Sequence, residues 1–261
     1  MSSYPLTNQA QRFFHFCFCA LSVALLSCLP AQGQNTPPAA GTNTVKHLEP
    51  ALIDVPDVAG LPRVLLLGDS VSMGYTLPVR KKLEGIANVH RPAANCCETT
   101  HGLRQLDKWL GNGHWDVIHF NFGLHDLKYH DANGKLVAPD KGQQTVPPEQ
   151  YRKQLHEITV RLQATGAKLI FATTTPVPPG TEGRIAGSEK TYNDIARSVM
   201  AELGVPVDDL WAYVVEEQKK NPSGPKAIQF PANVHFNWQG CDQLADQVAA
   251  SIKKQLPPGK N

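Results

Sequence analysis

The stretch Val64-Leu65-Leu66-Leu67-Gly68-Asp69-Ser70-Val71-Ser72 decides the fold. Its run of four apolar residues is typical of a strand that is buried on both faces of a parallel sheet. The Gly-Asp-Ser sequence predicts a sharp turn at the end of that strand, because glycine allows a tight backbone and Asp69 can accept hydrogen bonds from nearby amides. Ligands bind at the carboxyl ends of the strands in parallel sheets. We therefore expect the hydroxyl of Ser70 to lie exposed at a functional site.

Strands and helices alternate along the rest of the chain. A helix is expected over 73–83, with Pro78 limiting its start to about Leu77. The alternation predicts right-handed crossovers and a three-layer α/β/α fold around a parallel sheet of about five strands. The polar segment 130–146 is expected to be an extended surface loop. The other expected strands are 87–90, 117–121, 168–173 and 205–208, and the other expected helices are 103–110, 148–164, 189–203 and one from Trp238.

Candidate partners for Ser70 follow in the sequence. Gly123-Leu124-His125-Asp126 comes after the expected strand 117–121, and Asn233-Val234-His235-Phe236 precedes the last helix. A serine hydroxyl needs a base to become a good nucleophile, and an imidazole titrates near neutral pH. His235 is therefore the expected base. Amides at the start of the helix after Ser70 can stabilise an oxyanion.

These blocks together resemble the SGNH (GDSL-type) esterase and hydrolase family from Leu61 to the last helix. The resemblance implies a flavodoxin-like fold, with Ser70 as the nucleophile and as one oxyanion donor, and His235 as the base. In that family a glycine and an asparagine complete the oxyanion hole. An aspartate two or three residues before the histidine orients the ring.

The orienting partner departs from the family pattern, because Asn233 stands where the aspartate is expected. Three alternatives follow. Asn233 orients His235 in a weaker enzyme, another carboxylate such as Asp208 or Asp209 supplies the charge, or the site is inactive. In serine proteases the change from aspartate to asparagine costs on the order of 10⁴ in turnover.

The oxyanion positions also depart from the pattern. Cys97 stands where the family has its glycine, with Gly102 as the other candidate, and His125 stands where the family has its asparagine. A neutral imidazole can donate one N–H, so this role for His125 predicts a pH dependence through a second histidine. Asp69 and Asp126 are expected to be structural hydrogen-bond acceptors.

The N-terminal region is expected to be processed. Residues 1–33 have the apolar run and the small residues of a secretory signal peptide, which predicts a secreted or periplasmic protein without a membrane span. The alternative is a lipoprotein anchored through Cys28. Residues 34–60 are expected to be a flexible lead-in, and 61–256 the hydrolase-like domain.

Composition and cysteine usage narrow the function further. A net charge of +2 gives no electrostatic reason to expect nucleic acid as a partner. Cys96, Cys97 and Cys241 follow the leader, so either one of the first two bridges to Cys241 or all three are buried thiols. We expect no cofactor and no metal, although a site built from His119, His125 and His130 is the metal alternative.

The expected function is hydrolysis of a small acyl ester, such as acetyl, on a carbohydrate or another small molecule, through an acyl-serine intermediate. Two alternatives remain open at this point. One is a non-catalytic glycan- or ester-binding protein with a degenerate site. The other is an acyltransferase that shares the acyl-enzyme and differs only in its acceptor.

Overall fold

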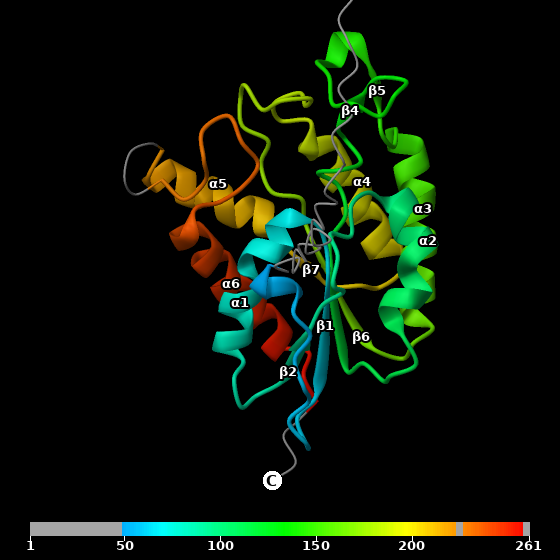
Figure 1. Ribbon diagram of the computed structural model, residues 1–261, viewed down its shortest axis with the longest axis vertical. Coiled ribbons are helices and arrows are strands. Elements are labelled where there is room, and N and C mark those ends of the chain that lie inside the picture. Colours follow the sequence, from blue (N-terminus) through cyan, green and yellow to red (C-terminus); the bar gives the residue numbers. More distant parts are fainter. Residues whose placement is uncertain (1–48, 223–226, 258–261) are drawn as a thin grey trace, which may run out of the picture. The chain divides into compact units, whose positions relative to one another are not determined.

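A parallel sheet of five strands forms the centre of the protein (Figure 1). The strand order is β2-β1-β3-β6-β7. The computed structural model describes residues 49–222 and 227–257. The strand order is that of the flavodoxin-like fold, in which the order reverses between β1 and β3. The predicted fold class is therefore confirmed. The strands are β1 (Arg63–Leu67), β2 (Asn88–His90), β3 (Val117–Phe120), β6 (Lys168–Ala172) and β7 (Val207–Asp208).

Helices cover both faces of the sheet and complete three layers (Figure 1). On one face α1 packs against α6, and α5 lies beside α6. On the other face α3 packs against both α2 and α4. None of the helices in 49–222 and 227–257 has the length and apolar character needed to cross a bilayer. The helices are α1 (Ser70–Lys82), α2 (Thr99–Leu110), α3 (Pro148–Gln163), α4 (Glu189–Glu202), α5 (Leu210–Lys220) and α6 (Trp238–Lys253).

Strand β1 lies in the interior of the sheet, as its apolar run predicts. It pairs with β2 through Val64 and Val89 and with β3 through Leu65 and Ile118. Each residue of 64–67 is at most 1% exposed. The carboxyl ends of β1 and β3, where the chain turns into the Gly-Asp-Ser and Gly-Leu-His-Asp blocks, therefore lie side by side.

Helix α1 begins at Ser70, so the predicted start near Leu77 is wrong. The Asp69 side chain caps the helix by accepting a hydrogen bond from the Val71 amide at 2.9 Å. Pro78 lies inside the helix, where its missing N–H removes a bond to the Gly74 carbonyl. Packing of α1 against α6 outweighs this local cost, because tertiary burial of one face supplies most of the stability of a helix in a protein.

Two other segments differ from their predictions. Helix α5 was not predicted, although Asp209 before Leu210 is a typical N-cap and accepts from the Ala212 amide at 3.1 Å. The segment 130–146 is not a simple loop, because β4 (Tyr129–His130) pairs antiparallel with β5 (Gln143–Gln144) around a short 3-10 helix (Pro139–Lys141). Figure 1 shows this hairpin above the carboxyl ends of the central strands.

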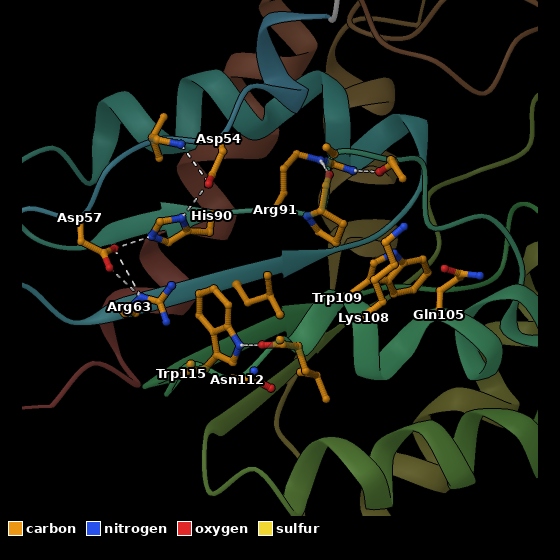
Figure 2. Close-up of a pocket in the computed structure, with 18 of the residues that line it drawn as sticks. Asp54, Asp57, Arg63, His90, Arg91, Gln105, Lys108, Trp109, Asn112 and Trp115 are labelled. Atoms are coloured by element: carbon orange, nitrogen blue, oxygen red, sulfur yellow. Dashed lines mark hydrogen bonds and ion pairs between the residues drawn. The ribbon is translucent and has the colours of Figure 1, made fainter.

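The described part of the expected lead-in contacts α1 and the edge strand β2. Residues 50–52 form a 3-10 helix in which Ala51 is buried. Residues 54–57 line a cavity of about 820 Å³ together with β2, α2 and Trp115 (Figure 2). The expected signal peptide, with Cys28, and 34–48 of the lead-in lie outside the described residues.

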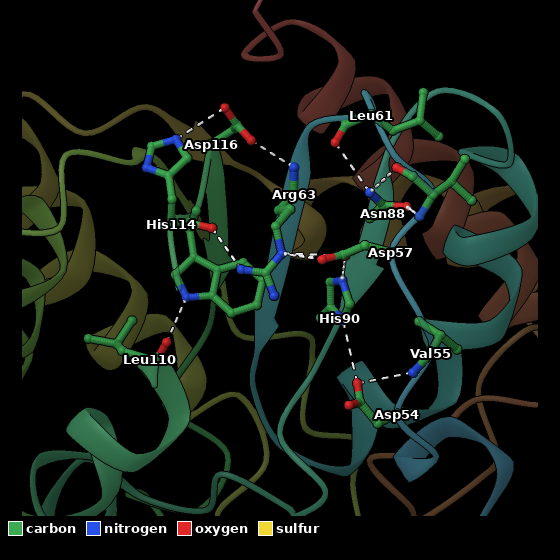
Figure 3. A network of polar contacts seen from close by, with 12 residues as sticks. Asp54, Val55, Asp57, Leu61, Arg63, Asn88, His90, Leu110, His114 and Asp116 are labelled. Atoms are coloured by element: carbon green, nitrogen blue, oxygen red, sulfur yellow. Dashed lines mark hydrogen bonds and ion pairs between the residues drawn. The ribbon is translucent and has the colours of Figure 1, made fainter. Parts of the chain in front are cut away.

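A polar network holds this segment against the edge strand β2 (Figure 3). The Asn88 side chain accepts from the Val58 amide at 2.8 Å and donates to the Val58 carbonyl at 3.0 Å. Asp57 contacts His90 at 2.6 Å and pairs with Arg63 at 3.1 Å. These contacts hold the segment beside the edge strand β2, which the local sequence of 34–60 did not indicate.

A buried polar pair spans the sheet from β3 to β7. His119 Nε2 lies 3.0 Å from Asp208 Oδ2, and both side chains are fully buried. Gln247 of α6 donates to the other Asp208 oxygen at 2.9 Å. The pair thus joins two strands that are separated by β6 and ties both to the α6 layer.

Removing one member of this pair is expected to destabilise the fold strongly. Asp208→Ala should lower the free energy of unfolding by about 3–5 kcal/mol, because it leaves a buried polar group without its partner. Replacing both residues, as in His119→Phe with Asp208→Leu, should recover most of that loss. Urea unfolding of the three proteins tests this, and a loss below about 1 kcal/mol in Asp208→Ala would contradict it.

Candidate active site

Ser70, His235 and Asn233 form a hydrogen-bonded chain at the carboxyl edge of the sheet. Ser70 Oγ lies 2.8 Å from His235 Nε2. His235 Nδ1 lies 2.7 Å from Asn233 Oδ1, which also accepts from the His235 amide at 2.9 Å. Because Asn233 Oδ1 can only accept, the neutral His235 ring carries its proton on Nδ1 and presents a lone pair to Ser70. This is the arrangement that a general base needs.

The two halves of this chain come from distant segments. Ser70 is the first residue of α1, so its amide is one of the helix's free N-terminal donors. His235 lies in a turn just before α6, where its carbonyl accepts from the Phe230 amide at 3.0 Å. Asn237 caps α6 by accepting from the Gly240 amide at 2.9 Å. The start of α6 thus holds the His235 turn over the start of α1.

Arg91 holds the backbone behind the nucleophile. It is 6% exposed, and its guanidinium donates to the Gly68 carbonyl at 3.2 Å and the Ala94 carbonyl at 3.1 Å. It also donates to the Ser72 and Thr76 hydroxyls, each at 3.0 Å. One buried side chain therefore joins the end of β1, the first turns of α1 and the loop after β2.

A cavity of about 480 Å³ opens beside Ser70 and His235. His125 and Lys128 line it from the segment after β3, and Arg184 lines it from the loop before α4. Lys128 Nζ lies 3.1 Å from His125 Nδ1. An ammonium can only donate, so His125 Nδ1 accepts and the neutral ring carries its proton on Nε2.

His125 stays neutral over the physiological range. Burial, with the nearby cations Lys128 and Arg184, lowers the pKa of His125 to about 3. The predicted pH dependence of activity through a second histidine would therefore fall well below neutral pH. His125 instead provides an N–H donor that does not change with pH above about 4.

The carboxylates considered as alternatives to Asn233 are engaged elsewhere. Asp208 contacts His119 beneath the sheet edge, as described above. Asp209 caps α5 and pairs with Arg197 at 2.8 Å, which helps to hold the pKa of Asp209 below its usual value. The side chain that contacts His235 Nδ1 is that of Asn233.

Cys97 has a backbone conformation typical of glycine, but its amide is not free to bind an oxyanion. Its φ is +55°, a left-handed value that favours glycine. Its amide donates to Asn95 Oδ1 at 2.9 Å, which differs from its expected role as an oxyanion donor. Asn95 was not predicted, yet it lines the cavity beside Ser70. Gly102 is not an alternative donor, because its amide donates to the Glu98 carbonyl at 2.9 Å within α2.

The three cysteines of 49–222 and 227–257 are free thiols, so the bridge to Cys241 is not formed. Cys96 is fully buried, which raises the pKa of its thiol to about 12. Cys241 faces α1 at Gly74, where an added Cβ would lie 2.9 Å from its sulfur.

The histidine cluster considered as a metal site does not come together, because His119 is buried against Asp208. Among the described residues, one group of ligand types does converge, with atoms of Cys97, Glu98 and His125 within 4.8 Å of one another. The ammonium of Lys128 on His125 opposes a cation there. The absence of a metal stays a prediction.

Comparison with known proteins agrees with this geometry. The model of the GDSL-like Lipase/Acylhydrolase family matches residues 66–242. The chain belongs to the GDSL-like lipase/acylhydrolase family. This match covers the Gly-Asp-Ser turn, the Gly-Leu-His-Asp block and the His235 turn. The suspected resemblance is therefore confirmed.

Solved structures of similar fold include an acetyl xylan esterase, which is 17% identical with a TM-score of 0.59 and covers 73% of this chain and 99% of that one. A lipase/acylhydrolase from Enterococcus faecalis is 20% identical with a TM-score of 0.54, covering 77% and 100%. A GDSL-like lipase from Bacteroides thetaiotaomicron is 13% identical with a TM-score of 0.57, covering 77% and 92%. These identities establish the shared fold alone. Curated proteins give no match to the chain.

Asp126 closes the Gly-Leu-His-Asp block as a structural acceptor, as predicted. It is fully buried and accepts from the Thr99 amide at 2.9 Å and from the Thr99 hydroxyl at 2.5 Å. Its second oxygen has no partner among the described residues. Burial raises the pKa of Asp126 to about 7.

This burial predicts a pH-dependent stability. The folded pKa of Asp126 lies above the unfolded value of 3.8, so its contribution is present at low pH and is lost as pH rises from about 4 to about 7. The loss amounts to about 4 kcal/mol at most. In Asp126→Asn, which keeps one acceptor for Thr99, this component should disappear. Unfolding free energies of both proteins across this range test it, and parallel curves would contradict it.

Proposed function

We propose that the protein is a serine esterase that hydrolyses a small acyl ester, such as an acetyl ester of a carbohydrate, through an acyl-Ser70 intermediate. The observation that carries this proposal is the 2.8 Å contact between Ser70 Oγ and His235 Nε2, with Asn233 holding the other ring nitrogen. The ester-hydrolase chemistry of the GDSL-like family supports it. The reaction needs no cofactor in this scheme.

The first step is acylation of Ser70. His235 Nε2 takes the hydroxyl proton while Ser70 Oγ attacks the ester carbonyl. The tetrahedral oxyanion accepts hydrogen bonds from the Ser70 amide, from the Nε2–H of His125 and from the side-chain amide of Asn95. Asn95 Oδ1 already accepts a hydrogen bond from the Cys97 amide. The side-chain NH₂ group of Asn95 therefore points away from Cys97 and remains available as a donor.

Collapse of the oxyanion releases the alcohol, which takes the proton from His235. In the second step His235 removes a proton from water, and the resulting hydroxide attacks the acyl-enzyme. Breakdown of this second intermediate releases the acid and returns the proton to Ser70 Oγ. No step requires the neutral His125 to change its protonation state.

Three observations support a carbohydrate ester in an extracellular compartment. Trp238 is 72% exposed and lies three residues after His235, and exposed aromatic rings provide faces for ligand stacking. One of the structural neighbours is an acetyl xylan esterase, which by its name acts on an acetyl ester of a carbohydrate. Export rests on the signal-like sequence of 1–33.

Loss of the nucleophile tests the proposal directly. Ser70→Ala should reduce hydrolysis of p-nitrophenyl acetate to the uncatalysed background from about pH 5 to 9, and it should abolish labelling by a fluorophosphonate. Ser198→Ala, an exposed serine of α4, is the matched control and should behave like the wild type. Equal rates and no labelling in all three proteins would indicate a binding protein. Ester formed with an added alcohol would indicate an acyltransferase.

The missing charge at Asn233 gives a second prediction. Asn233→Asp should raise kcat for p-nitrophenyl acetate by about tenfold or more, because a carboxylate stabilises the imidazolium that forms during acylation. The acid limb of the pH–rate profile should move to higher pH, since the carboxylate favours the protonated ring.

Asn233→Ala is the companion variant and should lower kcat, because His235 loses its orienting bond. If Asn233→Ala leaves kcat unchanged, Asn233 is not the orienting partner. A pH–rate profile of both variants on the same ester distinguishes the two outcomes.

A further inference from the structure

The cavity beside Ser70 holds two cations without an ion-pair partner. Lys128 and Arg184 both line it. Within 49–222 and 227–257, no carboxylate oxygen lies within 4.0 Å of either cationic group. Arg197 and Lys82, by contrast, pair with Asp209 and Asp242.

Both cations have N–H groups without a hydrogen-bond acceptor among the described residues. Lys128 donates one N–H to His125 Nδ1 at 3.1 Å. Arg184 donates its Nε–H to the Leu124 carbonyl at 3.1 Å and one terminal N–H to the Glu182 carbonyl at 3.4 Å. An ammonium has three donors and a guanidinium has five, so more than half of the donors have no acceptor among the described residues.

Holding these charges together costs free energy. Burial lowers the pKa of Lys128, and the charge of Arg184 lowers it further. Burial also lowers the pKa of Arg184. Three acids lie around them, namely Glu182, exposed at the rim, Glu98, beside His125, and Asp69, buried beneath the cavity. Because none of the three pairs with either cation, an anionic ligand would offset the cost of their burial.

We propose that the substrate of this site carries an anionic group, so that the ester is an acyl ester of an acidic sugar with a carboxylate or a sulfate. The free N–H groups of Arg184 form a planar fork that suits either anion, and Lys128 adds a point charge. The proposal rests on the proposed esterase function. It adds that Lys128 and Arg184 determine the substrate class.

The test compares matched esters that differ in charge. We expect kcat/KM for an acetylated galacturonate disaccharide to exceed that for the corresponding acetylated galactobiose by about tenfold or more at low salt, which corresponds to about one charge-assisted hydrogen bond. The ratio should shrink as salt is added, because ions screen partly exposed charges. Sulfate and galacturonate as competing inhibitors distinguish the two anions, since the better match binds more tightly.

Variants assign the preference to the two cations. Arg184→Gln should reduce the ratio of the two kcat/KM values about tenfold. Lys128→Gln should reduce it as well, and the ratio cancels any general effect of this change through His125. Arg152→Gln makes the same change in net charge on the outer face of α3 and should leave the ratio unchanged. An equal ratio in wild type and Arg184→Gln would overturn the proposal.

Failure of the proposed function would look different. If the wild type hydrolyses p-nitrophenyl acetate but shows no preference for the acidic sugar, the proposed esterase function is supported. The proposal of an anionic substrate is then contradicted. If no ester is hydrolysed, calorimetric titration of the intact Ser70→Ala protein with both sugars still tests the pocket. Tighter binding of the acidic sugar, lost in Ser70→Ala with Arg184→Gln, would support it, and equal binding would overturn it.

Discussion

The buried guanidinium of Arg91 is the interaction on which the nucleophile turn depends. A serine that follows a strand points its hydroxyl in a defined direction only if three segments stay fixed relative to one another. These segments are the strand end, the next helix and the neighbouring loop. Arg91 contacts all three, through Gly68, Ser72 and Ala94. The charge of Arg91 is almost completely removed from water. Each hydrogen bond that it donates therefore stabilises the fold more than a hydrogen bond at the surface does. The geometry of Ser70 is thus supported from beneath the sheet edge, away from the cavity.

The electrostatics of the cavity differ from those of a triad with a carboxylate. Asn233 brings no negative charge to His235, whereas Lys128 and Arg184 bring positive charge to the same cavity. A field of this sign favours a developing oxyanion and an anionic substrate, and it disfavours a charged imidazolium. A bound anion would neutralise the cations and so ease protonation of His235. Substrate binding and general-base catalysis would then be linked through charge.

Burial, together with the same cations, keeps His125 neutral. An imidazole in place of an amide donor is useful only if its proton sits on the nitrogen that faces the substrate. Lys128 occupies Nδ1 and so leaves the proton on Nε2. One ammonium therefore selects the tautomer of His125 and contributes to the positive field of the cavity.

The sequence by itself determined the central strand, the Gly-Asp-Ser turn, the parallel three-layer fold and the candidate pair of Ser70 and His235. Those features depend on local apolar runs and on short blocks whose order in the chain is informative. Tertiary structure decided the rest. Packing of α6 set the start of α1 despite Pro78, and contacts with Asn88 and His90 fixed the segment before β1. Asn95, Lys128, Arg184 and Arg91 entered the site without a local signal, because their roles depend on neighbours far away in the chain. Whether a charged side chain has an ion-pair partner depends on the residues that folding places around it. The same holds for whether an amide is free to donate a hydrogen bond.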